Sequence, residues 1–533
     1  MDFRYAISIV LEAHIPYVKE YNKEADLTLA GEEGRLFEYI CETLLPLLEV
    51  LHRLETDHIP FRISLAISPV LCHMLCDDHL QKKFLNYMDK QIDFGMQELE
   101  RTKDNNDVNK LALNYYNLAV DRRIAYTERY EKDLLKAFDF YRRRGKVEIL
   151  GSPATHAFLP FLSHNYESLQ AQMETPVINY RRNFGSSLQG FWLPNLGWTP
   201  SMDEFLKAYN YSYTIVDSHA LLFGNPAPAK GCFFPVKTPN GTIILARDLL
   251  AQRDIEKIAA DDLYRNNNRD VGYELAPEII GQFLNAEGGR SRTGYKYWSR
   301  AAADINDQNN IYNPQTANDK ISLHVRSFLE NMIIRLHEAS KNMEEIPICL
   351  YANNADFFGS FWHEGPAFLE TLFRMAAGYR DIKFINPSEY IFKYNISSLQ
   401  TVSPEISSNG VNGYCETWLD DSNDWIYRHL YRAMERMTEL AERFPDDTGL
   451  KERALNQAAR EILLAQSSDW SALLYKQDST EFARNKAENT LRNFTTIYEA
   501  LGSNYISTEW LTTLERRHNI FPNINYRVFR RKR

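Results

Sequence analysis

Short runs of consecutive apolar residues recur along the chain, separated by longer stretches with helical spacing. Such runs predict strands that are buried on both faces. Seven of them are expected: Tyr5–Leu11, Phe61–Ile67, Val147–Leu150, Gly190–Leu193, Tyr213–Val216, Thr242–Ala246 and Ile346–Tyr351. Most are followed at once by polar residues, and the intervals between them mostly hold helical segments. This pattern is typical of a parallel α/β barrel with its functional side chains at the carboxyl ends of the strands.

Two other parts of the chain have a purely helical pattern. Between the second and third strands, Leu134, Leu135, Phe138 and Tyr141 repeat at i, i+3 and i+4 spacing, and Gly145 is a natural helix stop. Beyond residue 400, three amphipathic helices are expected at Trp425–Phe444, Lys451–Gln466 and Glu481–Leu501. We therefore predict a barrel formed by residues 1–76 and 146–400, a helical insertion at 77–145 and a C-terminal helical domain at 401–533.

Composition narrows the classes of function. The chain of 533 residues carries a net charge of −10, which argues against nucleic acid as a partner because phosphate binding needs clustered cations. The one basic run, Arg527 to Arg533, is expected to be a solvated tail. The start of the chain lacks the features of a signal peptide, and no apolar run approaches the ~20 residues of a membrane span, so we expect a cytoplasmic protein.

The six cysteines follow neither a zinc nor a disulfide pattern, and we expect no metal or other cofactor. The 31 Tyr, 29 Phe and 8 Trp suit sugar binding, because pyranose rings stack on flat aromatic faces. Histidines and an aspartate at separate strand ends favour a polar pocket. The candidates at strand ends are Glu12, His14, His156, Asn195, Asp217, His219, Arg247, Asp248 and Asn354.

Five ordered blocks of sequence resemble glycoside hydrolase family 57, particularly its 1,4-α-glucan branching enzymes and amylase-like members. They are Leu11–Tyr17, Gly151–Pro160, Trp192–Pro200, Asn354–Gly365 and a set running from Asp424 to Trp470. The resemblance covers nearly the whole chain. It implies a (β/α)7 barrel with a helical insertion and a C-terminal helical domain, which agrees with the prediction from the apolar pattern.

The resemblance also implies a retaining mechanism, which needs two carboxyl groups roughly 5 Å apart. The family's nucleophile, a Glu, aligns with Asn195, and its general acid, an Asp, aligns with Asn354. A carboxamide carries no negative charge to stabilise an oxocarbenium ion and releases no proton at neutral pH. We therefore expect the family's chemistry to be lost.

Other family positions predict a binding cleft. Trp192, Trp362 and Trp418 match positions in or beside it, although Trp192 and Trp362 are equally compatible with the core. Asp469 matches a C-terminal residue that reaches towards substrate. Two departures affect the cleft itself, because the family usually has His at the position of Glu12 and a sugar-stacking Trp at that of Asn409.

Three hypotheses remain open. The first is a pseudoenzyme that binds α-glucan without cleaving it. The second is an active branching enzyme, glucanotransferase or glycosidase with relocated carboxylates, drawn from Glu12, Asp217, Asp248, Asp356 and Glu364. In that case Asp356, two residues after Asn354, is expected to share its face on an extended strand. The third is a structural or regulatory subunit that acts with a protein partner.

Overall fold

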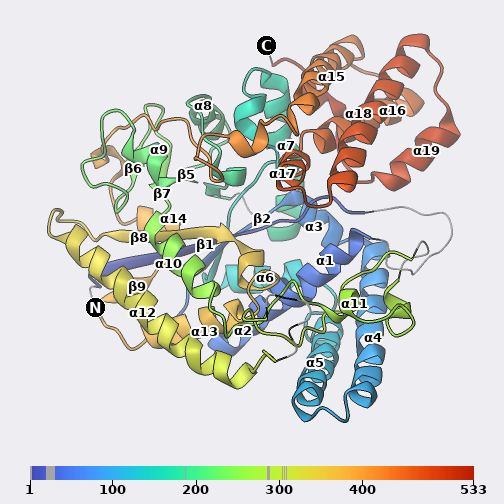
Figure 1. The fold of residues 1–533 in the computed structure, drawn as a ribbon. Coiled ribbons are helices and arrows are strands. Elements are labelled where there is room, and N and C mark those ends of the chain that lie inside the picture. The colour runs from blue at the N-terminus through green and yellow to red at the C-terminus, as the bar shows by residue number, and fades with distance from the viewer. Residues whose placement is uncertain are drawn as a thin grey trace.

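A parallel β-barrel occupies the centre of the molecule (Figure 1). The computed structural model describes residues 3–19, 31–185, 188–284, 288–302, 304, 307 and 309–532. The barrel strands are β1 (Tyr5–Ala13), β2 (Ile63–Ile67), β3 (Val147–Ile149), β4 (Gly190–Phe191), β5 (Tyr213–Val216), β7 (Ile243–Ala246) and β8 (Ile348–Asn354). They coincide with the seven strands that the apolar runs predict.

Two sheets join to close this barrel. One has the order β3-β2-β1-β8 and the other contains β4-β5-β7, with every one of these pairings parallel. Gly151, just beyond β3, forms a parallel bridge to Phe191 of β4. On the other side, the Asp248 N–H after β7 donates to the carbonyl of Leu350 in β8 at 2.7 Å. The result is a closed (β/α)7 barrel, as expected from the sequence.

Two short strands extend the barrel. β9 (Ile382–Phe384) pairs in parallel with the first residues of β1, and β6 (Val236–Lys237) pairs antiparallel with β7. Helices connect the successive barrel strands and cover the outside of the barrel (Figure 1). These outer helices are α1 (Glu33–Tyr39), α2 (Leu45–Thr56), α7 (Tyr166–Phe184), α8 (Ser201–Ala208), α9 (Ser218–Leu222), α10 (Leu249–Ala259), α12 (Pro314–Ser340), α13 (Gly365–Ala376) and α14 (Pro387–Ile391), whereas the short α11 (Val271–Glu274) lies beside the insertion.

Alternate residues of each strand face the barrel axis and form an apolar interior. They include Ala6, Val10, Ala66, Leu150, Trp192, Ile215, Leu245, Leu350 and Ala352. Continuing the same alternation to the carboxyl ends of four strands brings Glu12, Asp217, Arg247 and Asn354 to the axis. We call this ring of four residues the barrel mouth. In barrels of this kind, the carboxyl ends of the strands carry the functional site.

The predicted helical insertion lies between β2 and β3. It contains α3 (Pro69–Leu75), α4 (Asp78–Arg101), α5 (Asn106–Ile124) and α6 (Leu134–Arg143), with α4 and α5 forming a long hairpin (Figure 1). Described residues of the connection between β7 and β8 pack against this hairpin: the Tyr115 hydroxyl donates to the Lys296 carbonyl at 2.6 Å, and Gln91 Nε2 donates to the Thr293 carbonyl at 2.8 Å. The sequence pattern did not predict this contact.

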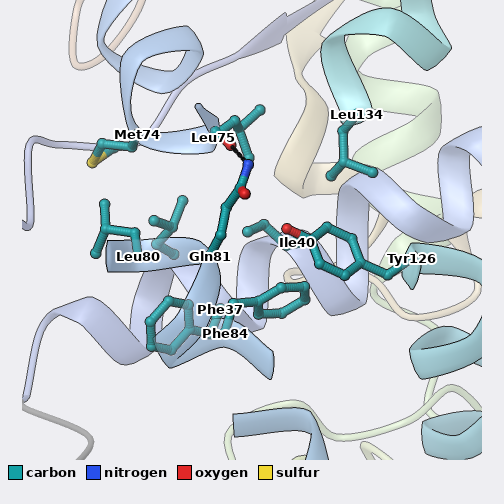
Figure 2. A pocket seen from close by; sticks show the side chains of 10 residues that line it. Phe37, Ile40, Met74, Leu75, Leu80, Gln81, Phe84, Tyr126 and Leu134 are labelled. Atoms are coloured by element: carbon teal, nitrogen blue, oxygen red, sulfur yellow. Dashed lines mark hydrogen bonds between the residues drawn. The ribbon is translucent and has the colours of Figure 1, made fainter. Parts of the chain in front are cut away.

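A small apolar cavity lies where α1, α3, α4 and α6 meet. Figure 2 shows Phe37, Leu80, Phe84 and other apolar side chains around it, and the accessible space is only about 10 Å³. That space is too small for a sugar and is comparable to a single water. The cavity is a packing feature of the insertion.

The C-terminal part is a helical bundle, as predicted. Its helices are α15 (Asp424–Arg443), α16 (Gly449–Ala465), α17 (Ser468–Lys476), α18 (Thr480–Ser503) and α19 (Thr508–Arg517). The expectation of a solvated basic tail is wrong for its first part, whereas Arg531 and Lys532 are exposed and Arg533 lies outside the described residues. Tyr526 and Phe529 are fully buried, and Arg527 Nε donates to the Pro445 carbonyl at 2.7 Å, because the aromatic side chains anchor this segment in the bundle. Within the described part of the chain, no helix combines the length and apolarity that a membrane span requires.

Candidate functional site

Two stacked histidines form the centre of the site. His14 follows β1 and His156 follows β3, and their rings lie 3.7 Å apart and 7° from parallel. His14 Nε2 lies 3.0 Å from Asp469 Oδ1, and His156 Nε2 lies 2.8 Å from Glu12 Oε1. Asp469 comes from α17, so the C-terminal bundle supplies a side chain to the barrel's site.

Hydrogen-bond counting assigns the protonation of His156. We assign the single proton of the Ser468 hydroxyl to the His156 carbonyl, which at 2.7 Å is the nearer of its two acceptors, the other being His156 Nδ1 at 3.0 Å. His156 Nδ1, at 3.0 Å from Ser468 Oγ, must therefore be a donor. Its other nitrogen faces the Glu12 carboxylate, which accepts only. His156 is thus an imidazolium, with a proton on both nitrogens.

The same logic gives His14 the opposite state. Ser68 Oγ accepts from the Leu71 N–H at 3.2 Å and is free to donate its own proton to His14 Nδ1 at 2.8 Å. The other nitrogen of His14 donates to Asp469, so one ring proton satisfies both contacts. The stack therefore pairs a neutral imidazole with a charged one.

The electrostatics agree with these states. Burial lowers the pKa of His14. Burial also opposes the charge on His156, but the neighbouring Glu12 carboxylate and Asp469 together raise the pKa of that ring above its usual value. Burial of Asp469 is outweighed by His14 and His156, which lower the pKa of its carboxyl. The group formed by Glu12, His14, His156 and Asp469 carries a net charge of −1.

Asn195 is connected to this group. It lies just after β4, and its Nδ2 donates to Ser468 Oγ at 3.1 Å, which leaves Oδ1 as the acceptor of the amide. Its backbone has a φ of 58°, in the left-handed region that Asn tolerates better than most residues. His156 has a φ of 55° as well. Such backbone costs of order 1 kcal/mol per residue and is often found at functional sites.

Asn354 is the last residue of β8 and lies opposite Glu12 in the parallel register of β1 and β8. It is exposed, whereas Glu12 is 3% exposed. Glu12 therefore joins the two asparagines: it is a strand neighbour of Asn354, and it reaches Asn195 through His156 and Ser468.

A second polar group completes the barrel mouth. Asp217 and Arg247 form a buried ion pair, and His219 Nδ1 lies 3.7 Å from Asp217 Oδ1. The neighbouring Asp217 carboxylate raises the pKa of His219, and His219 Nε2 lies 2.8 Å from the Gly413 carbonyl. Burial of Asp217 is outweighed by His219 and Arg247, which lower the pKa of the carboxyl.

Four residues expected in or beside the cleft are buried and make other contacts in this structure. Asp248 caps α10 by accepting from the Leu250 and Ala251 N–H groups at 2.9 and 3.1 Å. Trp192 and Trp362 are 1% and 0% exposed and belong to the apolar core, so neither ring offers a face to a sugar. Trp418 is 3% exposed and stacks on Phe158 at 4.6 Å. All three indole rings are buried for the same reason, because each packs against apolar neighbours.

The remaining carboxylates differ in their availability. The expectation that Asp356 continues the strand of Asn354 is wrong, since β8 ends at Asn354 and residues 355–358 form a 3-10 turn. Asp356 is half-buried, and burial raises its pKa to about 6. Within the described ranges, its carboxylate has no hydrogen bond to another side chain. Glu364 is buried and accepts from the Arg265 N–H at 2.9 Å.

Donor atoms of His14, His156 and Asp469 lie within 4.8 Å of one another, the spacing of a metal site. The stacking makes the two imidazoles unsuitable as joint ligands. A metal lies in the plane of each imidazole at about 2.0 Å from nitrogen, whereas these ring planes are nearly parallel and 3.7 Å apart. Asp469 accepts a hydrogen bond from His14 at 3.0 Å, whereas His156 Nδ1 lies 3.6 Å from Asp469 and is bound to Ser468.

The sequence did not identify the contacts that three residues make in the site, although Asn409 is one of the departures from the family. Ser468 and Ser68 orient the two histidines, and the Asn409 N–H donates to the Asn195 carbonyl at 2.8 Å. Ser68 directly follows a predicted strand, which was a usable signal. The other two lie more than 200 residues from their partners, and no local pattern reports such a contact.

Comparison with known protein families matches most of the chain. The model of glycosyl hydrolase family 57 matches residues 8–256, and the model of the 1,4-alpha-glucan branching enzyme C-terminal region matches residues 429–529. A 1,4-alpha-glucan branching enzyme from Thermococcus kodakarensis is 26% identical over 97% of this chain and 77% of its own length.

Solved structures show the same likeness. The alpha-amylase AmyC from Thermotoga maritima is 32% identical, with a TM-score of 0.91, over 99% of this chain and 100% of the other. A branching enzyme of the same family from Pyrococcus horikoshii is 24% identical, with a TM-score of 0.87, over 99% of this chain and 97% of the other, and shows the fold.

Proposed function

The chain belongs to glycosyl hydrolase family 57, and from this membership we propose that it binds α-glucan at the barrel mouth without cleaving or transferring it. The proposal takes its ligand from the similar proteins, which are named as an alpha-amylase and 1,4-alpha-glucan branching enzymes. In this proposal Asn195 stands at the position of the nucleophile and Asn354 at that of the general acid.

One observation carries the proposal: the Asn195 amide, which donates one N–H to Ser468, is neutral and offers a ligand a carbonyl oxygen and a second N–H but no negative charge. An amide oxygen is a poor nucleophile and leaves an oxocarbenium ion without a counter-charge. It remains a good hydrogen-bond acceptor for a sugar hydroxyl. Asn354 is exposed at the end of β8, opposite Glu12 of β1, and can hydrogen-bond a glycosidic oxygen without protonating it.

The other buried carboxylates of the site support the absence of chemistry. Glu12 is held by His156, Asp469 by His14 and Ser467, and Asp217 by Arg247. A carboxylate used as nucleophile in these pairs would leave a buried cation or imidazole unpaired. That loss costs several kcal/mol.

Affinity electrophoresis in gels containing amylopectin tests the proposal, together with a reducing-sugar and branching assay on the same protein. We expect retardation by amylopectin without product formation. Asn195→Ala and Asn354→Ala should each weaken retardation. Asn342→Ala, an exposed asparagine before β8, is the matched control and should migrate like the unchanged protein. Turnover that persists through repeated purification, or equal mobility with and without amylopectin, would falsify the proposal.

Asp356 supports a second candidate, an enzyme with a relocated general acid. Its carboxyl has a pKa raised to about 6 by burial and has no side-chain hydrogen-bond partner in the described residues, so it is suited to proton donation. This candidate lacks a second available carboxylate. The others at or near the site, on Glu12, Asp217, Asp248, Glu364 and Asp469, are all held by hydrogen bonds or ion pairs. If the unchanged protein turns over glucan, Asp356→Asn should reduce the rate about 10²-fold or more; an unaffected rate excludes the candidate.

A further inference from the structure

A continuous series of hydrogen bonds runs from Glu12 through His156 and Ser468 to Asn195. The distances are 2.8 Å from Glu12 Oε1 to His156 Nε2, 3.0 Å from His156 Nδ1 to Ser468 Oγ, and 3.1 Å from Ser468 Oγ to Asn195 Nδ2. We call these four residues the Glu12–Asn195 relay. Three of them are almost completely buried, with 3% exposure for Glu12, 5% for His156 and 3% for Ser468.

The two ends of the relay differ in charge. A buried imidazolium requires a nearby negative charge, because an unpaired buried ion costs several kcal/mol. At the Asn195 end the amide is neutral. The counter-charge in direct hydrogen-bond contact with His156 therefore comes from Glu12, on the opposite ring nitrogen. Asp469 lies 3.6 Å from His156 Nδ1, but its carboxylate is already bound by His14 and Ser467.

We propose that Glu12 is a positioning residue whose charge holds His156 as the double donor that orients the Asn195 amide, so that the negative charge absent from position 195 is supplied by position 12. Glu12 is not available to a substrate, because it is buried and its Oε1 is bound by His156. Glu12 affects a ligand indirectly: it fixes the protonation of His156, His156 and Ser468 orient the Asn195 amide, and Asn195 Oδ1 then faces the ligand in a fixed direction.

The proposal has a consequence for restoring chemistry. A carboxylate introduced by Asn195→Glu alone would share one imidazolium with Glu12. Two carboxylates that flank one imidazolium, Glu12 directly and the new one across Ser468, repel each other, so the new carboxyl would be favoured in its protonated form and would be a weak nucleophile. Removing the charge of Glu12 at the same time should relieve that repulsion. The inference deepens the proposed function and depends on it only in the second of two tests.

The first test measures His156 without any glucan. In ¹⁵N-histidine-labelled protein, the ring resonances of His156 are identified by their loss in a His156→Gln variant and titrated in the unchanged protein and in Glu12→Gln. Glutamine keeps the hydrogen bond as a donor to neutral Nε2, so the fold should be preserved. We expect the His156 pKa to fall by about one pH unit or more when the charge is lost. An unchanged titration overturns the inference and leaves the proposed function intact.

The second test compares N195E/N354D with E12Q/N195E/N354D in glucan turnover. Both carry the same backbone cost at position 195, so the comparison isolates Glu12. We expect at least tenfold higher turnover in the triple variant. Equal turnover in two folded variants overturns the inference. If neither variant acts, amylopectin retardation of the unchanged protein determines whether the proposed function fails, while the His156 titration alone decides the inference.

Discussion

The imidazole rings of His14 and His156 stack 3.7 Å apart, yet their surroundings shift their pKa values in opposite directions, upward for His156 and downward for His14, and we assign the charge to His156. Two imidazolium rings at this separation would repel strongly, since a unit charge pair at 4 Å interacts by about 4 kcal/mol at an effective dielectric constant of 20. Each ring has its own carboxylate: Glu12 for His156 and Asp469 for His14. The asymmetry follows from the serines, because Ser68 donates to its histidine and Ser468 accepts.

This asymmetry predicts a pH dependence of stability. The pKa of His14 is lowered from 6.5 by burial, so the folded state binds fewer protons at this ring than the unfolded state. Its contribution to stability is present above pH 6.5 and is lost as the pH falls through the folded pKa. We expect His14→Gln to flatten the stability profile between about pH 7 and 5 in urea denaturation. An unchanged slope would show that His14 is not neutral in the fold.

Ser468 is expected to matter for both stability and binding. Removing its hydroxyl in Ser468→Ala leaves His156 Nδ1–H and Asn195 Nδ2 without their acceptor, which should cost about 1–3 kcal/mol. Amylopectin retardation should weaken because Asn195 loses its orientation. Ser503→Ala removes an exposed hydroxyl that donates to the Glu499 carbonyl, and should change neither property. Equal effects of the two variants would contradict the role assigned to Ser468.

Asp248 is predicted to act on stability alone. Asp248→Ala removes the acceptor of two N–H groups at the start of α10 and the ion pair with Arg335, at 3.3 Å. We expect a loss of about 1–3 kcal/mol in chemical denaturation, with unchanged retardation by amylopectin. Asp133→Ala, which removes an exposed cap from α6, should cost less. If Asp248→Ala lost glucan binding without losing stability, that result would contradict the prediction and assign Asp248 to the cleft.

Gly413 is predicted to hold the loop above the mouth. It has a φ of 81°, and an added Cβ would lie 2.8 Å from the His219 ring. Gly413→Ala should cost more than the ~1–2 kcal/mol of left-handed backbone alone and should weaken amylopectin retardation. Gly145→Ala measures the backbone cost by itself, because Gly145 has a φ of 67° and open space around it. If the two variants lose equal stability, the contact with His219 is unimportant.

The apolar runs predicted every barrel strand because strands buried on both faces leave a continuous hydrophobic signal. The placement of His14 and His156 at strand ends followed from the same signal. The sequence did not predict whether the Trp192 side chain points into the core or into the cleft. β4 has only two residues, so it gives no alternation from which to extrapolate. Likewise, nothing local shows that the chain turns after Asn354 and takes Asp356 out of the strand.

Contacts between residues far apart in the sequence could not be predicted either. Ser468 is 312 residues from His156, and the packing of the connection between β7 and β8 on the α4–α5 hairpin joins regions that share no repeating pattern. The packing of the C-terminal segment on the bundle was also not predicted. Its charge is visible in the sequence, whereas the burial of Tyr526 and Phe529 is not.

The contact between His14 and Asp469 spans 455 residues, from the first strand to the start of α17. A ribosome therefore releases the first strand of the barrel long before the partner of its histidine has been made. Until then, the hydrogen-bonding group that contains His14 and Glu12 is incomplete, because Ser468 and Asp469 have not yet been added to the carboxyl end of the barrel. A chain cut short before α15 should thus lack a completed site, however well its strands pair.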